Sequence, residues 1–426
     1  MSLGVKIFRG GEDLPSAIGQ LEKEAAVDKT YVLYTGNEIV GWTQILKQDT
    51  GQYELGYLEI LPKYRGKKYG RALARFALYE NAAREIYALT IIPEFFEKLG
   101  FVRAAYPPFV DHSSPECQAC EPARCVALLF TKPADLVRYG AEQKLLRKYE
   151  QDIITGRNFM GSEFSAANEK TWTYAENIYF LEIDNFLFLV AYPLAEEPFG
   201  VVCPYRSIPD TALDKYFARL RELNIHQLAY VNAQICRLLH KYSGAPRLRF
   251  QEDRANFDYL YKVSDFAAYA GARFADKRNR LKKFLRNNSP AEIISYRPEL
   301  KEMFLSFAEK KLTAMQVGVI SAEVLKLGLA QDLYQGFLVK IGRAEIGLLL
   351  YSELNPRTAI VHFELIDESY DGIAQFMNNY LGQALSGKYT FINREQDLGL
   401  TGLRQSKLSY NPYRLVKKYA VEFCIL

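Results

Sequence analysis

Apolar and polar residues alternate along the first part of the chain in a pattern that predicts several β-strands. Two such stretches, 39–46 and 53–61, follow one another after a Gly-Asn-Glu turn and are expected to pair. An apolar stripe at helical spacing predicts a helix over 70–84, and further strands are expected over 87–92 and 126–130. This mixed order of strands and helices predicts an α/β (α+β) domain of about 130 residues.

The strand that ends near residue 61 runs directly into a Gly-rich turn and then into a helix. Gly66 and Gly70 allow the backbone to turn tightly with its N–H groups pointing inward. The first turn of the following helix presents unpaired N–H groups and the positive end of its dipole to the same point. The turn also carries four cationic side chains: Arg65, Lys67, Lys68 and Arg71. The segment predicts a pyrophosphate-binding loop; the alternative is a basic surface connection without a ligand.

This loop resembles motif A of the GNAT N-acetyltransferases, Q/R-x-x-G-x-G/A after a strand end, with Ile60, Pro62, Arg65 and Gly70 on matching positions and Lys68 where the family usually has Gly. Residues 93–101 resemble the closing helix of that family. The resemblance implies a GNAT fold over about 1–132 with acetyl-CoA, or another acyl-CoA, as cofactor. It implies the following binding residues: Ile60, Pro62, Arg65, Gly66, Lys67, Lys68, Tyr69, Gly70 and Arg71.

Acetyl transfer to an amine needs a base, and two carboxylates precede the loop. Glu54 lies eleven residues before Arg65, where several GNAT members place their base, and Glu59 lies beside the strand end. Strict alternation along a strand puts the two on opposite faces, and we favour Glu54 as the catalytic residue. Phe96 occupies the position where the family often has a tyrosine acid. A different proton donor, or a domain that only binds its ligand, is therefore expected.

A turn, strand pair and loop near residue 40 recur near residue 346. The interval from the turn glycine to the strand glutamate is 18 residues from Gly41 to Glu59 and 17 residues from Gly347 to Glu364. The repeat predicts a second GNAT-like unit, but Asp371 stands where the first copy has its arginine. Because an acid would repel a pyrophosphate, this copy is not expected to use coenzyme A in the standard way.

The chain is expected to form three domains. Residues 1–132 form the GNAT domain and 266–426 the repeated GNAT-like unit, and 133–265 are large enough for a degenerate unit without a phosphate loop. The middle segment is predicted to begin with a charged helix over 133–151. The end of the third unit is predicted to contain a helix over 375–385.

From about residue 135 the chain resembles the C-terminal catalytic domain of phosphatidylglycerol lysyltransferase. The matching segments are 256–261, 277–284, 362–364, 393–399 and 403–412. This resemblance implies a tandem GNAT-like pair that moves aminoacyl groups from charged tRNA. The membrane-embedded part that a lipid-modifying enzyme would use is not found in this sequence, so a lipid acceptor is not favoured.

Polar side chains gather near the end of this third unit, where such folds keep their sites at strand ends. The predicted second site consists of His362, Glu364, Asn393, Arg394, Glu395, Asp397, Arg404, Lys407 and Tyr410, and its arginines suit a carboxylate or a phosphate. The alternative is a lattice of ion pairs that stiffens a loop. A basic amphipathic helix is also predicted over 273–286, either as a tRNA-binding face or as an ordinary solvated one.

Composition narrows these possibilities. A length of 426 residues predicts two or three domains, and 49% hydrophobic residues are ample for burial. The formal net charge of +4 does not indicate binding of a polyanion through bulk charge. No apolar run approaches the roughly 20 residues that span a bilayer, and no export signal opens the chain. We therefore expect a cytoplasmic protein without a membrane partner.

Three of the six cysteines form a cluster with a histidine. His112, Cys117, Cys120 and Cys125 lie within fourteen residues and could ligate zinc tetrahedrally. The alternatives are a redox disulfide or a loop with thiols that bind nothing.

Three functions follow from these patterns. The first is an acyl-CoA-dependent N-acyltransferase that acetylates an unidentified small-molecule or peptide amine. The second is an aminoacyl-tRNA-dependent aminoacyltransferase centred on the C-terminal pair. The third is an acyl-CoA sensor without turnover, and fold alone does not choose among them.

Overall fold

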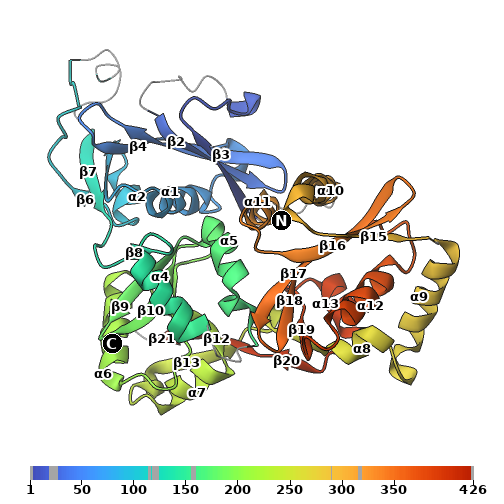
Figure 1. Ribbon diagram of the computed structural model, residues 1–426. Helices are drawn as coiled ribbons and strands as arrows, with labels where there is room; N and C mark the ends of the chain where they lie inside the picture. The colour runs from blue at the N-terminus through green and yellow to red at the C-terminus, as the bar shows by residue number, and fades with distance from the viewer. Residues whose placement is uncertain are drawn as a thin grey trace.

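Three mixed β-sheets form the framework of the chain (Figure 1). The computed structural model describes residues 3–18, 27–113, 117, 124–154, 160–288, 290–314 and 319–423. Within these residues each sheet contains seven strands. No helix among them is long and apolar enough to cross a lipid bilayer.

The first sheet is formed by residues 3–131. Its strands are β1 (Leu3–Arg9), β2 (Val27–Thr35), β3 (Glu38–Lys47), β4 (Tyr53–Ile60), β5 (Glu85–Thr90), β6 (Val102–Arg103) and β7 (Val126–Thr131), in the order β1-β2-β3-β4-β5-β7-β6. Helices α1 (Tyr69–Glu80) and α2 (Pro93–Glu97) follow β4 and β5. The strands expected from the sequence are confirmed. Helix α1 ends before residue 84 because Asn81 turns into an extended conformation.

The second sheet combines residues 137–252 with the C-terminal strand. Its strands are β8 (Val137–Arg138), β9 (Ile178–Ile183), β10 (Phe186–Ala191), β11 (Phe199–Val202), β12 (Gln227–Asn232), β13 (Leu248–Glu252) and β21 (Lys418–Phe423). Its helices are α4 (Gln143–Tyr149), which continues as a π-helical turn over Glu150–Ile154, α5 (Ala166–Glu176), α6 (Asp210–Glu222) and α7 (Ala233–Lys241). The single helix expected over 133–151 is wrong, because residues 137–138 pair with β9.

The third sheet lies in the C-terminal half. Its strands are β14 (Asp258–Lys262), β15 (Glu292–Ser295), β16 (Gln335–Ile341), β17 (Ala344–Asn355), β18 (Thr358–Ile366), β19 (Phe391–Asn393) and β20 (Arg414–Val416). Its helices are α8 (Val263–Ala268), α9 (Ala275–Asn287), α10 (Lys301–Ala314), α11 (Val319–Ala330), α12 (Ile373–Leu385) and α13 (Thr401–Leu408). Helix α9 is the basic helix expected over 273–286.

The second and third sheets exchange strands, which the expected boundary between 265 and 266 does not allow for. Strand β14 precedes that boundary but pairs with β19 and β20 of the third sheet. Strand β21 ends the described chain but pairs with β12 and β13 of the second sheet. Each of the two sheets therefore takes its sixth strand from the other half, so 133–265 and 266–426 are not independent domains.

All three sheets repeat one plan. Counted across the sheet from β1, β8 or β15, the fourth and fifth strands are parallel. These pairs are β4 with β5, β11 with β12, and β18 with β19. The first pair is joined only at Glu54 and Tyr87, and the second only at Gly200 and Leu228. Parallel strands that meet at one point diverge beyond it, so the first and second sheets open there, whereas β18 and β19 pair at three positions. The sequence repeat predicts this shared plan for the first and third sheets.

Helix α1 joins the first and second sheets (Figure 1). Residues 73–80 of this helix are all buried, and the ring of Tyr79 stacks on Tyr192 with centroids 3.4 Å apart. The buried guanidinium of Arg75 donates to the carboxylate of Glu197 at 2.9 Å and to two carbonyl groups of the β10–β11 loop. The N-terminal unit is therefore packed into the rest of the protein and shares a hydrophobic core with the second sheet.

Candidate functional site

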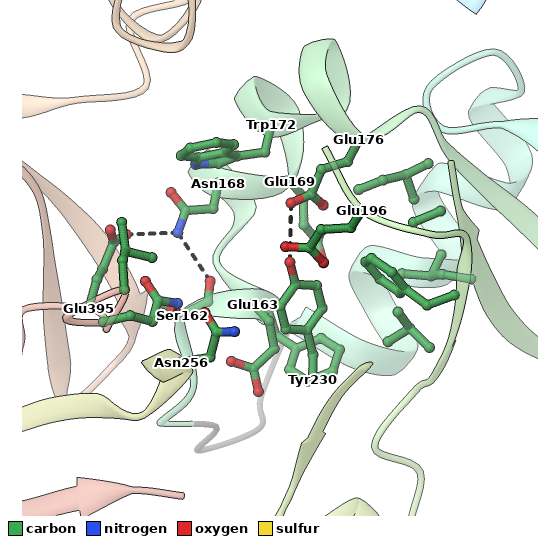
Figure 2. Close-up of a pocket in the computed structure, with 18 residues that line it drawn as sticks. Ser162, Glu163, Asn168, Glu169, Trp172, Glu176, Glu196, Tyr230, Asn256 and Glu395 are labelled. Carbon is green, nitrogen blue, oxygen red and sulfur yellow. Dashed lines mark hydrogen bonds between the residues drawn. The ribbon is translucent and has the colours of Figure 1, made fainter. Parts of the chain in front are cut away.

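An acidic cavity of about 230 Å³ lies beside helix α5, against strands β9 to β12 (Figure 2). It is lined by Ser162, Glu163, Phe164, Asn168, Glu169, Trp172, Glu176, Ile178, Leu189, Ala191, Glu196, Phe199, Val201, Tyr230, Asn256, Glu395, Gln396 and Leu398. Five of these residues are glutamates, and none is Lys, Arg or His. The second sheet supplies the floor and the β19–α13 loop of the third sheet supplies one wall, so both halves of the chain build the site.

Two glutamates of α5 have raised pKa values. Glu169 is 4% exposed and accepts hydrogen bonds from two tyrosine hydroxyl groups, and burial raises its pKa to about 8. Glu176 accepts a hydrogen bond from the hydroxyl of Tyr230 at 3.2 Å. Burial, together with the negative charge of Glu196, raises the pKa of Glu176 to about 7. Both carboxyl groups would lose their protons more readily if a cation entered the cavity.

Glu163 is balanced by a buried lysine. The Nζ atom of Lys418 lies 2.9 Å from Oε2 of Glu163 and 2.9 Å from Oδ1 of Asp258. Ser162 donates to the same aspartate from its backbone N–H at 2.6 Å and from its hydroxyl at 3.0 Å. Because Asp258 belongs to β14 and Lys418 to β21, this network holds the two exchanged strands together behind the cavity wall.

The pKa of Glu395 is shifted in the opposite direction to those of Glu169 and Glu176. Burial alone would raise its pKa, but hydrogen bonds from His362 and Asn168 outweigh that effect and lower the pKa of Glu395. The distances are 3.2 Å from Nδ1 of His362 and 2.8 Å from Nδ2 of Asn168. The other ring nitrogen of His362 lies 2.8 Å from Oγ of Ser352. Glu395 is therefore ionised at neutral pH.

The cavity is suited to an organic cation with an aliphatic stem. Carboxylates supply the counter-charge for an ammonium group, and the faces of Trp172 and Tyr230 favour a positive charge near them. Apolar side chains such as Leu189 and Val201 line the sheet side and can cover methylene groups. The difference in pKa gives the carboxyl groups separate roles. Glu395 is ionised before a ligand arrives, whereas Glu169 and Glu176 lose their protons when a cation binds.

The predicted second site is mostly used for structure. Asp397 is 0% exposed and accepts hydrogen bonds from Arg404 at 2.8 and 2.9 Å, from Arg254 at 2.9 Å and from the hydroxyl of Tyr259 at 2.6 Å. Burial opposes ionisation of Asp397, but the hydrogen bonds from Arg404 and Tyr259 lower its pKa. Both arginines are therefore engaged in fixing the β19–α13 loop.

Other members of the predicted second site are likewise occupied. Arg394 pairs with Glu364, and its guanidinium lies 5.0 Å from the ring centre of Tyr410. The Asn393 amide donates to the carbonyl of Met160 at 2.6 Å, and Lys407 donates to two carbonyl groups of the same loop. Only Glu395 of the predicted set lines the acidic cavity, with His362 directly behind it. The geometry favours the ion-pair lattice for the other seven.

The basic loop of the first unit has the backbone conformation expected of an anion cradle. Gly66 and Lys68 have φ angles of 78° and 62°, and Lys68 precedes the first residue of α1. A left-handed conformation costs a residue with a Cβ atom roughly 1–2 kcal/mol, so Lys68 stands in a conformation that glycine would adopt freely. Pro62 opens a 3₁₀ turn, and Nε of Arg65 donates to the carbonyl of Ile60 at 2.8 Å.

A β-bulge changes the expected faces of the two candidate bases. Trp42 pairs with Glu59 and Gln44 with Gly56, so β4 has one residue more than β3 over this interval. Glu54 pairs with Leu46, an even number of residues from Trp42. Because the bulge shifts the alternation by one, Glu54 and Glu59 share a face, and the expectation of opposite faces is wrong. Glu54 is half-buried and accepts a hydrogen bond from Gln48, whereas Glu59 is exposed.

In the third unit the position of the phosphate loop is covered by helix α9. Gly372 has a φ of 90°, and a Cβ atom there would lie 2.4 Å from the carbonyl oxygen of Arg280. Lys283 pairs with Asp371 at 2.7 Å, and Arg280 lies 3.5 Å from the same carboxylate. The basic helix thus supplies the counter-charge for the acid that replaces Arg65. This arrangement agrees with the expectation that the third unit does not bind coenzyme A in the standard way.

The predicted metal cluster is only partly described. Cys120 lies outside the described residues, and Nδ1 of His112 lies 3.5 Å from Sγ of Cys117. Among the residues that are described, no group of three or more His, Cys, Asp or Glu side chains is arranged to hold a metal ion. Zinc at His112, Cys117, Cys120 and Cys125 stays a prediction.

The acidic cavity was not predicted from the sequence. Its glutamates come from separate segments, and no motif joins them. One local signal exists, because Glu169, Trp172 and Glu176 are spaced by three and four residues and share one face of α5. A buried helix face that carries two carboxylates and an indole is unusual, and it could have been recognised from the sequence.

Two family models match the chain. The model described as "Phosphatidylglycerol lysyltransferase, C-terminal" matches residues 210–422, which is half of the chain. The model described as "Acetyltransferase (GNAT) domain" matches residues 27–103. The first match includes five of the residues that line the acidic cavity, among them Tyr230 and Glu395, and the second match includes the basic loop.

Several solved structures are similar to parts of this chain. A conserved protein of unknown function from Bacteroides thetaiotaomicron has 23% sequence identity and a TM-score of 0.60, over 65% of this chain and 97% of that one. L-PGS from Bacillus licheniformis has 12% identity and a TM-score of 0.47, over 66% and 92%. A Bacillus subtilis acetyltransferase in complex with CoA has 17% identity and a TM-score of 0.23, over 31% and 100%.

Proposed function

Because this chain belongs to the family of the phosphatidylglycerol lysyltransferase C-terminal domain, we propose that it is an aminoacyltransferase whose donor is a charged tRNA. Family membership makes the chain an acyltransferase; the donor and the acceptor belong to the proposal. The aminoacyl group would enter the acidic cavity with its ammonium groups among the glutamates. This function replaces acetylation of an amine as the main hypothesis.

The observation that carries the proposal is the composition of the cavity. A single α-ammonium group needs one carboxylate, but four glutamates besides the lysine-paired Glu163 line a space of about 230 Å³. A cationic side chain, as in a lysyl group, would account for the additional carboxylates. Such a cation would also lower the raised pKa values of Glu169 and Glu176. Both carboxyl groups would then ionise as the cation binds, and their negative charges would balance its positive charge.

The transfer itself requires movement of one proton. The acceptor oxygen or nitrogen attacks the aminoacyl ester carbon, the bond from that carbon to the ribose oxygen breaks, and the ribose oxygen leaves with a proton. Glu395 is the group placed to take the acceptor's proton, because it lines the cavity in its ionised form. His362, 3.2 Å away, positions this carboxylate and stabilises its charge.

A transfer assay tests the proposal. Lysyl-tRNA with a labelled lysyl group is incubated with the protein and with amine or hydroxyl acceptors, including phosphatidylglycerol vesicles. We expect label to leave the RNA and appear on one acceptor class, and the rate to fall at least tenfold in Glu395→Gln. The exposed Glu368→Gln is a matched control with an unchanged rate. Label that stays on the RNA with every acceptor would contradict the proposal.

We propose as a second function that the N-terminal unit binds acetyl-CoA or a related acyl-CoA. The supporting observation is the left-handed backbone at Gly66 and Lys68 ahead of a buried helix, on the open side of diverging strands. Calorimetry with acetyl-CoA, with Arg71→Glu and with the more distant Lys6→Glu as control, tests this function. Equal affinity in all three proteins, or none in the wild type, would overturn it.

A further inference from the structure

A basic groove runs along helix α7, on the other side of the segment that walls the acidic cavity. It consists of two adjoining cavities of about 230 and 320 Å³ that share Gln234 and Arg237. The first lies at the start of α6 and the second lies between α7 and the β20–β21 segment. The two cavities therefore border one another at α7.

The charge of this groove is almost entirely positive. Its cations are Arg206, Arg237, Lys241, Arg414 and Lys417, and Asp210 is its one acid. Lys417 pairs with Glu252 at 2.5 Å, and the carboxylate of Asp210 accepts a hydrogen bond from the backbone of Ser243. The other four cations are exposed and form no ion pair with any residue that the structure describes.

The position of the groove within the fold points to an anionic ligand. The turn from β11 into α6 corresponds in topology to the turn from β4 into α1, which is the basic loop of the first unit. In the second unit this turn lacks the glycines, but Arg206 and two cations from α7 face the same depression. Arg237 and Lys241 are four residues apart, so their Cβ atoms lie about 5–6 Å from each other on one helix face.

The groove and the acidic cavity are separated by one stretch of backbone. Gly161 lines the groove and Glu163 lines the cavity. A Cβ atom on Gly161 would lie 2.3 Å from Oε1 of Glu163, so the carboxylate of Glu163 packs directly against the glycine that lines the groove. A ligand with a negative backbone and a positive end would find both charges matched within this short distance.

We propose that the groove binds the phosphodiester backbone of RNA, near the end that carries the aminoacyl group. The inference rests on the proposed function, which supplies a polyanion with a cationic end. Unpaired cations in a recess bind successive phosphates and release their counterions, which makes the affinity depend steeply on salt.

Two alternatives fit the structure less well: binding of RNA to the basic helix, and binding of a membrane to the groove. The cations of the basic segment 273–286 are largely used within the protein, since Arg273 pairs with Asp265, Lys283 with Asp371, and Arg278 donates to two carbonyl groups. A membrane surface would need apolar side chains to insert next to the cations. None of the large hydrophobic side chains that are exposed among the described residues lines the groove.

Salt-dependent binding of an uncharged tRNA transcript tests the groove. Fluorescence anisotropy is measured from 50 to 300 mM NaCl for the full chain and for Arg237→Glu/Arg414→Glu. We expect at least a tenfold loss of affinity at low salt and a shallower slope of log K against log salt, by about 1.5. The control is Lys282→Glu/Arg286→Glu on α9, which changes charge equally and should weaken binding less than threefold.

A second variant, Arg206→Glu/Lys241→Glu, keeps the test valid if the first melts early. Equal RNA affinity in both groove variants and the wild type would overturn the inference. Loss of binding to phosphatidylglycerol vesicles with RNA affinity unchanged would do so as well, and would assign the groove to a membrane. A tRNA without an aminoacyl group places nothing in the acidic cavity. The RNA-binding result therefore does not depend on the outcome of the lysyl-transfer assay.

Discussion

Replacing Glu176 by glutamine should stabilise the protein at pH 8, because it removes a carboxylate whose charge is costly there. The pKa of this group is raised from 4.5 to about 7, chiefly by burial. The folded state therefore holds a proton that the unfolded state releases between these values. The contribution to stability is fully present below pH 4.5 and is lost as the pH rises to 7.

The size of the effect follows from this interval. A shift of 2.5 pKa units corresponds to about 3 kcal/mol at pH 8, and to less than about 1 kcal/mol at pH 5. Because the side chain of Glu176 is only partly buried, we expect about half of that upper limit. Glutamine keeps an oxygen that can accept the hydrogen bond from Tyr230, so little opposes the gain.

Thermal unfolding at two pH values measures this prediction. A gain of about 1.5 kcal/mol should raise the Tm of a chain of this length by roughly 2 °C at pH 8, and by a third of that or less at pH 5. Glu368→Gln, which alters an exposed loop carboxylate, should shift the Tm by less than 1 °C at either pH. A gain of equal size at both pH values, or a loss at pH 8, would show that the charge of Glu176 is not destabilising.

Three further predictions concern the framework. Gly41→Ala should lower the Tm by several degrees, because the added Cβ would lie 2.2 Å from a backbone oxygen of β4. Gly347→Ala should lower the Tm less, because the atom nearest to its Cβ is the sulfur of the flexible Met377 side chain. Arg75→Met should lower both the Tm and the affinity for lysine amide, since this arginine anchors the loop that carries Glu196, and both are measured by calorimetry. Lys68→Gly should raise the Tm slightly, by relief of its left-handed backbone, and a fall would contradict the assigned conformation.

Local patterns predicted the individual elements well. The turn, strand pair and helix around Gly41 and Gly70 obey short-range rules of alternation, helical spacing and glycine use, and the structure confirms them. The internal repeat extended the same plan to the third unit. These rules could not predict the exchange of β14 and β21, because pairing between strands about 155 to 195 residues apart leaves no mark on the local pattern of either strand.

The site was predicted only in part for the same physical reason. Glu395 was singled out because it belongs to a dense polar segment, and the structure places it in the acidic cavity. Asp397 and Arg404 belong to the same segment, but they are paired with each other by two hydrogen bonds and do not line the cavity. Residue type and spacing do not reveal which polar groups find partners inside the fold. The bulge at Glu59 is a similar case, since one extra residue reverses a face.

Titration of the protein with lysine amide tests the central claim most directly. At pH 7 the raised pKa values of Glu169 and Glu176 mean that the entering ammonium groups should displace protons, so the measured heat should vary with the ionisation enthalpy of the buffer. We predict saturable binding that tightens from pH 6 to pH 8, with net proton release that decreases in Glu176→Gln and with weaker binding of norleucine amide. Absence of binding, or equal affinity for both amides with no proton released, would contradict a cation-binding cavity.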